Sequence, residues 1–132
     1  MINVNKKILW ISDFDIEFAP GGAQRSDKII IDEGRLQGKN IKKVEFNSLP
    51  NSDDFFDFDL VVSSNVTYIA HENPDFIDLL SKHPNHVRIE HDSNKYVTKE
   101  TRSKIFSNCK RTFFLSDYHY SFFKELYGDI FK

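Results

Sequence analysis

A histidine–aspartate pair is the residue combination in this chain most suited to catalysis. His91 and Asp92 end the strand that is expected at 87–92. A histidine, whose pKa is ordinarily about 6.5, exchanges a proton near neutral pH, and a neighbouring carboxylate orients it or contacts a substrate hydroxyl. His91 and Asp92 are therefore candidates for acid–base chemistry. The alternative is that polar residues at a strand end only cap a neighbouring helix and bind water.

A glycine pair, Gly21 and Gly22, stands between a long polar-aromatic loop and a predicted helix. Glycine lets a ligand approach the backbone closely, and the first amides of a helix suit a phosphate. Arg25 lies in the first turn, where the helix dipole disfavours a cation, so its presence there favours an anionic ligand. The spacing is neither that of the dinucleotide fingerprint nor that of the P-loop. A plain turn with a solvated arginine is the alternative.

Strands and helices alternate along the chain. Strands are expected at 7–13, 41–47, 59–65, 87–92 and 111–116, and helices at 23–37, 73–82, 98–107 and 117–128. This alternation predicts one Rossmann-like domain over residues 1–132, of the α/β class, with a doubly wound parallel sheet and helices on both faces. Right-handed crossovers restrict the topology, and the simplest order is 3-2-1-4-5. That order makes the first and fourth strands neighbours.

Local patterns add expectations about single residues. Ala23, Ile29, Ile30 and Leu36 are expected to form the buried side of the first helix, which Gly38 should end. The half-polar strand at 41–47 is expected near an edge of the sheet, and residues 48–54 as a loop. The acidic residues from 53 to 59 are interpreted as a solvated loop, and His83 and His86 as solvent-exposed around a turn.

The expected strands end in polar residues, and ligands of open parallel sheets bind beyond these carboxyl ends, at the switch point of the strand order. The predicted order brings the glycine loop and the His91–Asp92 loop into one crevice. The predicted binding residues are Asp13, Gly21, Gly22, Arg25, Asn65 and Ser116, with His91 and Asp92 as the catalytic pair.

Composition narrows the function classes. The 132 residues fit one domain, and thirteen phenylalanines supply a core. A net charge of −2 gives no general attraction to nucleic acid, and the single cysteine, Cys109, excludes an internal disulfide and a cysteine-based zinc cluster. The histidines have no metal-ligand spacing, so neither metal nor cofactor is expected. Without a signal peptide or an apolar run of roughly 20 residues, a cytoplasmic protein is expected, and peripheral membrane contact is left open.

Three stretches resemble the amino-terminal half of retaining, nucleotide-sugar-dependent glycosyltransferases with the glycosyltransferase-B fold. The resemblance covers nearly the whole chain. The stretches are Gly21-Gly22-Ala23-Gln24-Arg25 after the first strand, Arg88-Ile89-Glu90-His91-Asp92, and Phe114-Leu115-Ser116-Asp117-Tyr118 with a helix ending at Tyr127-Gly128.

The resemblance implies an acceptor-side domain in a hexosyltransferase. Sugar would pass from a nucleoside diphosphate sugar to a hydroxyl acceptor, with the glycine loop near the donor phosphates and His91 near the acceptor. The family holds the donor nucleotide mainly in a second Rossmann-like domain, whose basic pair and acidic motif have no match in this chain. We therefore expect a domain that does not transfer sugar by itself.

Two other classes stay open. A flavodoxin-like interaction or regulatory module is the main alternative. In its phosphoacceptor form, Asp13 and Asp15 would supply the acidic cluster, but Asn65 and Ser116 stand where an aspartate and a lysine are needed. A nucleotide-binding oxidoreductase is disfavoured by the long first loop and the missing fingerprint.

Overall fold

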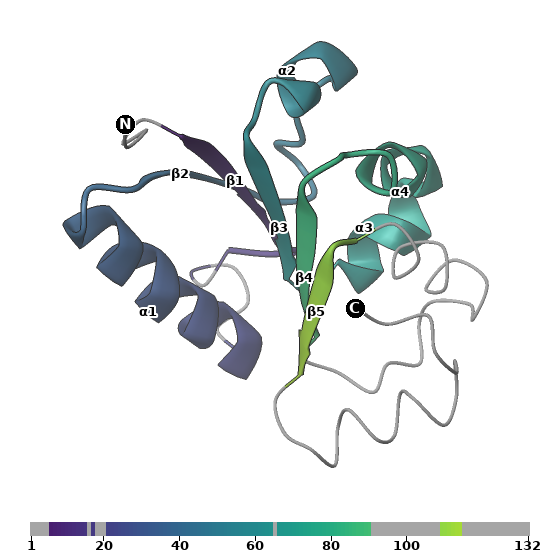
Figure 1. Ribbon diagram of the computed structural model, residues 1–132. Coiled ribbons are helices and arrows are strands. Elements are labelled where there is room, and N and C mark those ends of the chain that lie inside the picture. Colours follow the sequence, from purple (N-terminus) through teal and green to yellow (C-terminus); the bar gives the residue numbers. More distant parts are fainter. Residues whose placement is uncertain (1–5, 16, 18–20, 65, 91–108, 115–132) are drawn as a thin grey trace.

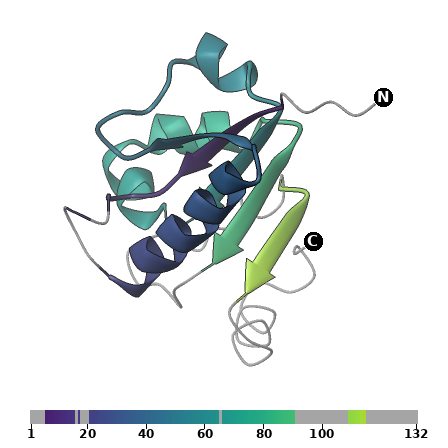
Figure 2. The same ribbon diagram turned by 90° about the vertical axis from the view of Figure 1, so that its left-hand side faces the viewer.

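Five parallel strands form a single sheet in the structure, a computed structural model that describes residues 6–15, 17, 21–64, 66–90 and 109–114. The order across the sheet is β2-β1-β3-β4-β5. The strands are β1 (Lys7–Ile11), β2 (Asn40–Val44), β3 (Leu60–Ser64), β4 (His86–Glu90) and β5 (Arg111–Phe114). Helices lie against both faces (Figures 1 and 2), so the expected α/β class and doubly wound arrangement are confirmed.

The strand order corrects the expected 3-2-1-4-5. β3 pairs with both β1 and β4, so the first and fourth strands are not neighbours. Right-handed crossovers permit either order, and burial explains the observed one. β2 exposes Lys42 and lies at the edge, as expected for 41–47, whereas the central residues of β3 are buried and need a strand on each side.

One face of the sheet is covered by α1 (Gly22–Leu36), which lies across it in Figure 2. The helix ends where expected: Gly38 has φ +84°, a left-handed conformation that glycine adopts without strain. Ile31 packs against Trp10 of β1 and Val62 of β3. This small cluster anchors the helix to the middle of the sheet.

The buried side of α1 is not the expected one. Ile29, Ile30 and Leu36 are exposed by 70%, 47% and 83%. The buried residues are instead Gln24, Asp27 and Ile31, which follow the same helical spacing along the opposite side. The helix therefore turns two polar side chains and Ile31 toward the sheet and leaves three large apolar side chains exposed to solvent.

The opposite face carries the main hydrophobic core. Three short helices cover it: α2 (Ser52–Phe56), α3 (Thr67–Glu72) and α4 (Pro74–Leu80). The Asn73 side chain caps α4 and Pro74 opens it, as expected, while α2 begins inside the expected loop 48–54. The core joins apolar residues of β1, β2 and β3 to these helices. It contains Leu9, Ile11, Val44, Phe55, Phe58, Val61, Val66, Ile69, Ala70, Phe76, Ile77 and Leu80.

The expected helices at 98–107 and 117–128 lie outside the described residues. The single cysteine, Cys109, is buried. Asp57 forms an ion pair with Lys7, so the acidic stretch from 53 to 59 is partly tied to β1. Among the described residues, no helix combines the length and the apolar character needed to cross a membrane.

Candidate functional site

The switch point of the observed sheet lies between β1 and β3, because α1 leads from β1 to one side and α3 and α4 lead from β3 to the other. Polar residues follow or end both strands here. Ser12 and Asp13 come directly after β1, and Ser64 ends β3. All three are at least 98% buried. These three side chains are therefore not exposed at the surface of this sheet edge, where a ligand would bind.

Asp13 holds a helix in place. Its two carboxylate oxygens accept hydrogen bonds from the backbone amides of Tyr68 and Ile69, each at 2.9 Å. These amides belong to the first turn of α3 and have no acceptor within the helix. Asp13 was expected to bind substrate, and the structure shows that it caps α3 from the loop that follows β1.

Ser64 links the sheet to α1. Its hydroxyl donates a 2.7 Å hydrogen bond to a carboxylate oxygen of Asp27, and both side chains are buried. A buried carboxylate is costly unless polar groups surround it. The contact fixes the helix relative to β3 and holds the Asp27 carboxylate close to the switch point.

The amino end of α1 is open. Gly21 precedes the helix, no side chain caps it, and its first turn has no acidic residue. Among the described residues, a β-carbon added at Gly22 would meet no atom within 4 Å. Arg25 follows in the first turn and is exposed. The geometry of Gly22 and Arg25 suits an anion at the helix amino end.

At Gly21, unlike at Gly22, a neighbouring side chain lies close to the position that a β-carbon would occupy. A β-carbon there would lie 2.9 Å from Oε1 of Gln24, so the flexible Gln24 side chain would have to shift. The absent side chain therefore leaves room for the Gln24 side chain to fold back over the start of the helix. Of the two glycines, only Gly22 leaves its surroundings open to a ligand.

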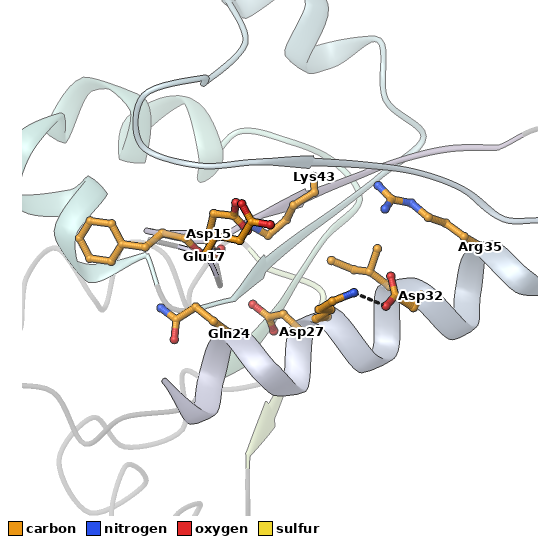
Figure 3. A pocket seen from close by; sticks show the side chains of 11 residues that line it. Asp15, Glu17, Gln24, Asp27, Asp32, Arg35 and Lys43 are labelled. Atoms are coloured by element: carbon orange, nitrogen blue, oxygen red, sulfur yellow. Dashed lines mark hydrogen bonds and ion pairs between the residues drawn. The ribbon is translucent and has the colours of Figure 1, made fainter. Parts of the chain in front are cut away.

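A cavity of about 240 Å³ lies between α1, the loop that follows β1, and β2. Figure 3 shows its polar side chains converging from these three elements. It is lined by Ser12, Phe14, Asp15, Glu17, Gln24, Asp27, Lys28, Ile31, Asp32, Arg35 and Lys43. The sequence interpretation missed Gln24 and Asp27. Their spacing with Ile31 along one side of the helix was the available signal.

A buried polar row runs along β4 on the face opposite α1. His86, Arg88 and Glu90 alternate along the strand and are each at most 1% exposed. The Arg88 guanidinium donates to one Glu90 oxygen at 2.8 and 3.0 Å, and Nε2 of His86 lies 2.7 Å from the Ser63 hydroxyl. The row ties β3 to β4 through side chains.

The protonation of this row follows from its burial. Burial first, then the positive charge of Arg88, and then the electrostatic effect of the nearby His83 when it is protonated, lower the pKa of His86 from 6.5 to about 3. Burial also lowers the pKa of His83, against the opposing effect of its hydrogen bond to the Phe58 carbonyl. Both imidazoles are neutral at pH 7. The expectation that His83 and His86 are solvent-exposed is wrong, because they are 2% and 0% exposed.

The structure brings together only part of the predicted site. Gly22 and Arg25 share the amino end of α1, with Gly21 beside them and Asp13 engaged with α3. The remaining predicted residues lie outside the described part of the chain: Asn65, His91, Asp92 and Ser116. Comparisons with protein-family models, with curated proteins and with solved structures find no match.

Proposed function

We propose that this chain is the acceptor-side domain of a glycosyltransferase that moves a sugar from a nucleoside diphosphate sugar to a hydroxyl acceptor. In this proposal the donor phosphates lie at the amino end of α1. His91 and Asp92 act at the acceptor, and a second domain holds the rest of the donor. The chain by itself binds the donor weakly and does not turn over.

The observation that carries the proposal is the open amino end of a fifteen-residue helix beside the switch point of a parallel sheet. Gly22 leaves the backbone accessible, and no carboxylate in the first turn competes with an anion. The helix dipole and the Arg25 charge add in the same direction. The resemblance of the sequence to glycosyltransferase-B domains supplies the substrate class.

Equilibrium binding of UDP-glucose and GDP-mannose tests this proposal, with uridine as the control that lacks phosphate. We expect dissociation constants in the millimolar range, corresponding to about −4 kcal/mol, for at least one donor, and none for uridine. Arg25→Ala should weaken binding about two- to fivefold, because a single exposed charge at a helix end contributes little. Lys39→Ala removes an exposed charge near the other end of α1 and should change nothing.

Two results would contradict the proposal. One is donor binding that Arg25→Ala and Lys39→Ala weaken equally, since the anion would then not lie at the amino end of α1. The other is sustained sugar transfer by this chain alone, because the proposal assigns most donor contacts to a second domain.

A flavodoxin-like regulatory module is the second candidate, and the observed strand order favours it. The order 2-1-3-4-5 is the order of flavodoxin-like folds, although a fold alone does not establish a function. A phosphoacceptor site needs available carboxylates after β1, but both oxygens of Asp13 accept amides of α3. Incubation with acetyl phosphate should therefore leave the chain unmodified. A phosphorylated aspartate would support this second candidate instead.

A further inference from the structure

The outward side of α1 is a second feature, distinct from the open helix end that carries the proposed function. Ile29 and Leu36 lie two turns apart on this side and are exposed by 70% and 83%. The helix itself lies on the outside of the sheet, as Figure 2 shows. Leaving large apolar side chains in water forgoes the free energy of burying them, so aligned ones are typical of a surface that another protein covers.

The residues around Ile29 on this side are arranged as complementary pairs. Four positions before Ile29 stands the cation Arg25, and four positions after it stands the anion Glu33. Seven positions before it stands Gly22, which has no side chain, and seven positions after it stands the large Leu36. All five residues are exposed, and at 3.6 residues per turn they lie within about 40° of Ile29 around the helix.

A second copy of the chain fits this pattern. When two α1 helices pack antiparallel about a twofold axis at Ile29, a residue before Ile29 in one copy lies opposite the residue equally far after it in the other. Arg25 of each copy then reaches Glu33 of the other, and neither residue has an ion pair within the described part of the chain. The antiparallel direction also places opposite ends of the two helix dipoles together.

The apolar residues fit the same arrangement. Leu36 of each copy lies opposite Gly22 of the other, where a β-carbon would meet no described atom within 4 Å. The glycine therefore leaves space for the leucine side chain. Ile29 meets Ile29 of the other copy at the axis, so both exposed apolar residues are covered.

We propose that this chain associates with a second copy of itself through the outward sides of two antiparallel α1 helices. A fifteen-residue helix is about 22 Å long, so the contact covers a few hundred Å² per copy, against about 800 Å² in a standard interface. The dimer should therefore be weak and reversible, with a dissociation constant of about 0.1–1 mM.

This association does not rest on the proposed function. The first amides of a helix point along its axis, so a phosphate beyond the start of α1 leaves the side of the helix free. Arg25 stands beside both places, and the test below therefore leaves it unchanged.

Cysteine cross-linking tests the position of the axis. Packed helix axes lie about 8–10 Å apart and Cα atoms about 2.3 Å from each axis, so the two Ile29 Cα atoms should be about 5 Å apart, a distance that a disulfide spans. Ile29→Cys should form a covalent dimer under mild oxidation. Leu36→Cys is the matched control: it is more exposed, but its two copies would lie about 20 Å apart and should cross-link far more slowly. The native Cys109 is buried.

Sedimentation equilibrium at up to about 2 mM protein tests the charge pairing. Glu33→Arg places two cations opposite each other on both sides of the axis, so it should weaken association about fivefold or more. Glu72→Arg makes the same charge reversal at an exposed residue of α3, on the opposite face of the sheet, and should leave association unchanged.

Faster cross-linking of Ile29→Cys than of Leu36→Cys, with association that Glu33→Arg weakens and Glu72→Arg preserves, supports the proposal. Three results overturn it: a chain that stays monomeric, which would assign this surface to a different partner; cross-linking of Leu36→Cys at least as fast as that of Ile29→Cys; or association that Glu33→Arg leaves unchanged. None of these variants alters Arg25 or the first amides of α1, so this test and the donor-binding test can fail independently.

Discussion

Acidification should destabilise this protein through His86. Its side chain is fully buried beside Arg88, and its pKa falls from 6.5 in the unfolded chain to about 3 in the folded one. Between these values the unfolded state binds a proton that the folded state does not. The contribution of neutral His86 to the free energy of folding is therefore fully present above pH 6.5, and it is lost as the pH falls toward 3.

The magnitude follows from proton linkage. Each pH unit below the unfolded pKa costs about 1.4 kcal/mol, so His86 alone should remove about 2 kcal/mol between pH 7 and pH 5. The lowered pKa of His83 acts in the same direction. A small domain has roughly 5–15 kcal/mol of stability, and a loss of this size is easily measured.

Urea unfolding followed by the fluorescence of Trp10, the only tryptophan and 5% exposed, measures this loss. His86→Gln keeps a polar atom near Ser63 but cannot titrate, so its stability should fall by about 2 kcal/mol less than that of the parent over this pH range. His71→Gln changes an exposed histidine on α3 and serves as the control, with the parent pH dependence. Equal pH dependence in the parent and His86→Gln would refute the reasoning.

Substitutions at Asp13, at the Arg88–Glu90 pair and at two glycines test the packing of the fold. Asp13→Ala should cost about 1–3 kcal/mol and speed hydrogen exchange of the first amides of α3, because two of them lose their acceptor. Arg88→Met should cost about 3–5 kcal/mol in urea unfolding, whereas Arg88→Met with Glu90→Leu should recover most of that loss. Gly38→Ala should cost about 1–2 kcal/mol because of its left-handed conformation, while Gly22→Ala, in open space within the first turn of α1, should be nearly neutral or stabilising.

The sequence pattern predicted the elements better than their arrangement. Apolar runs and, for β2, alternation of polar and apolar residues located all five strands, and Asn73 with Pro74 located the start of α4. The strand order was wrong because crossover handedness does not distinguish the two topologies. The exposed Lys42 of β2 and the buried centre of β3 contained the deciding information.

The site was predicted only in part, because some of its residues are positioned by contacts between distant parts of the chain. Counting apolar residues on α1 selected Ile29, Ile30 and Leu36 as its inward side. The side that faces the sheet is instead the one on which Ile31 packs and Asp27 accepts the Ser64 hydroxyl. A hydrogen bond between residues 37 positions apart leaves no trace in a local pattern. The same holds for His86, whose burial depends on strands paired on both sides of it.

Nuclear magnetic resonance of the ¹⁵N-labelled chain during titration with UDP-glucose and GDP-mannose tests the central claim most directly. The proposal predicts that at least one donor shifts the amides of Gly22, Ala23 and Gln24 most, and that inorganic pyrophosphate shifts the same amides. Shifts centred elsewhere, or none at millimolar donor, would contradict the placement of the donor phosphates at the amino end of α1.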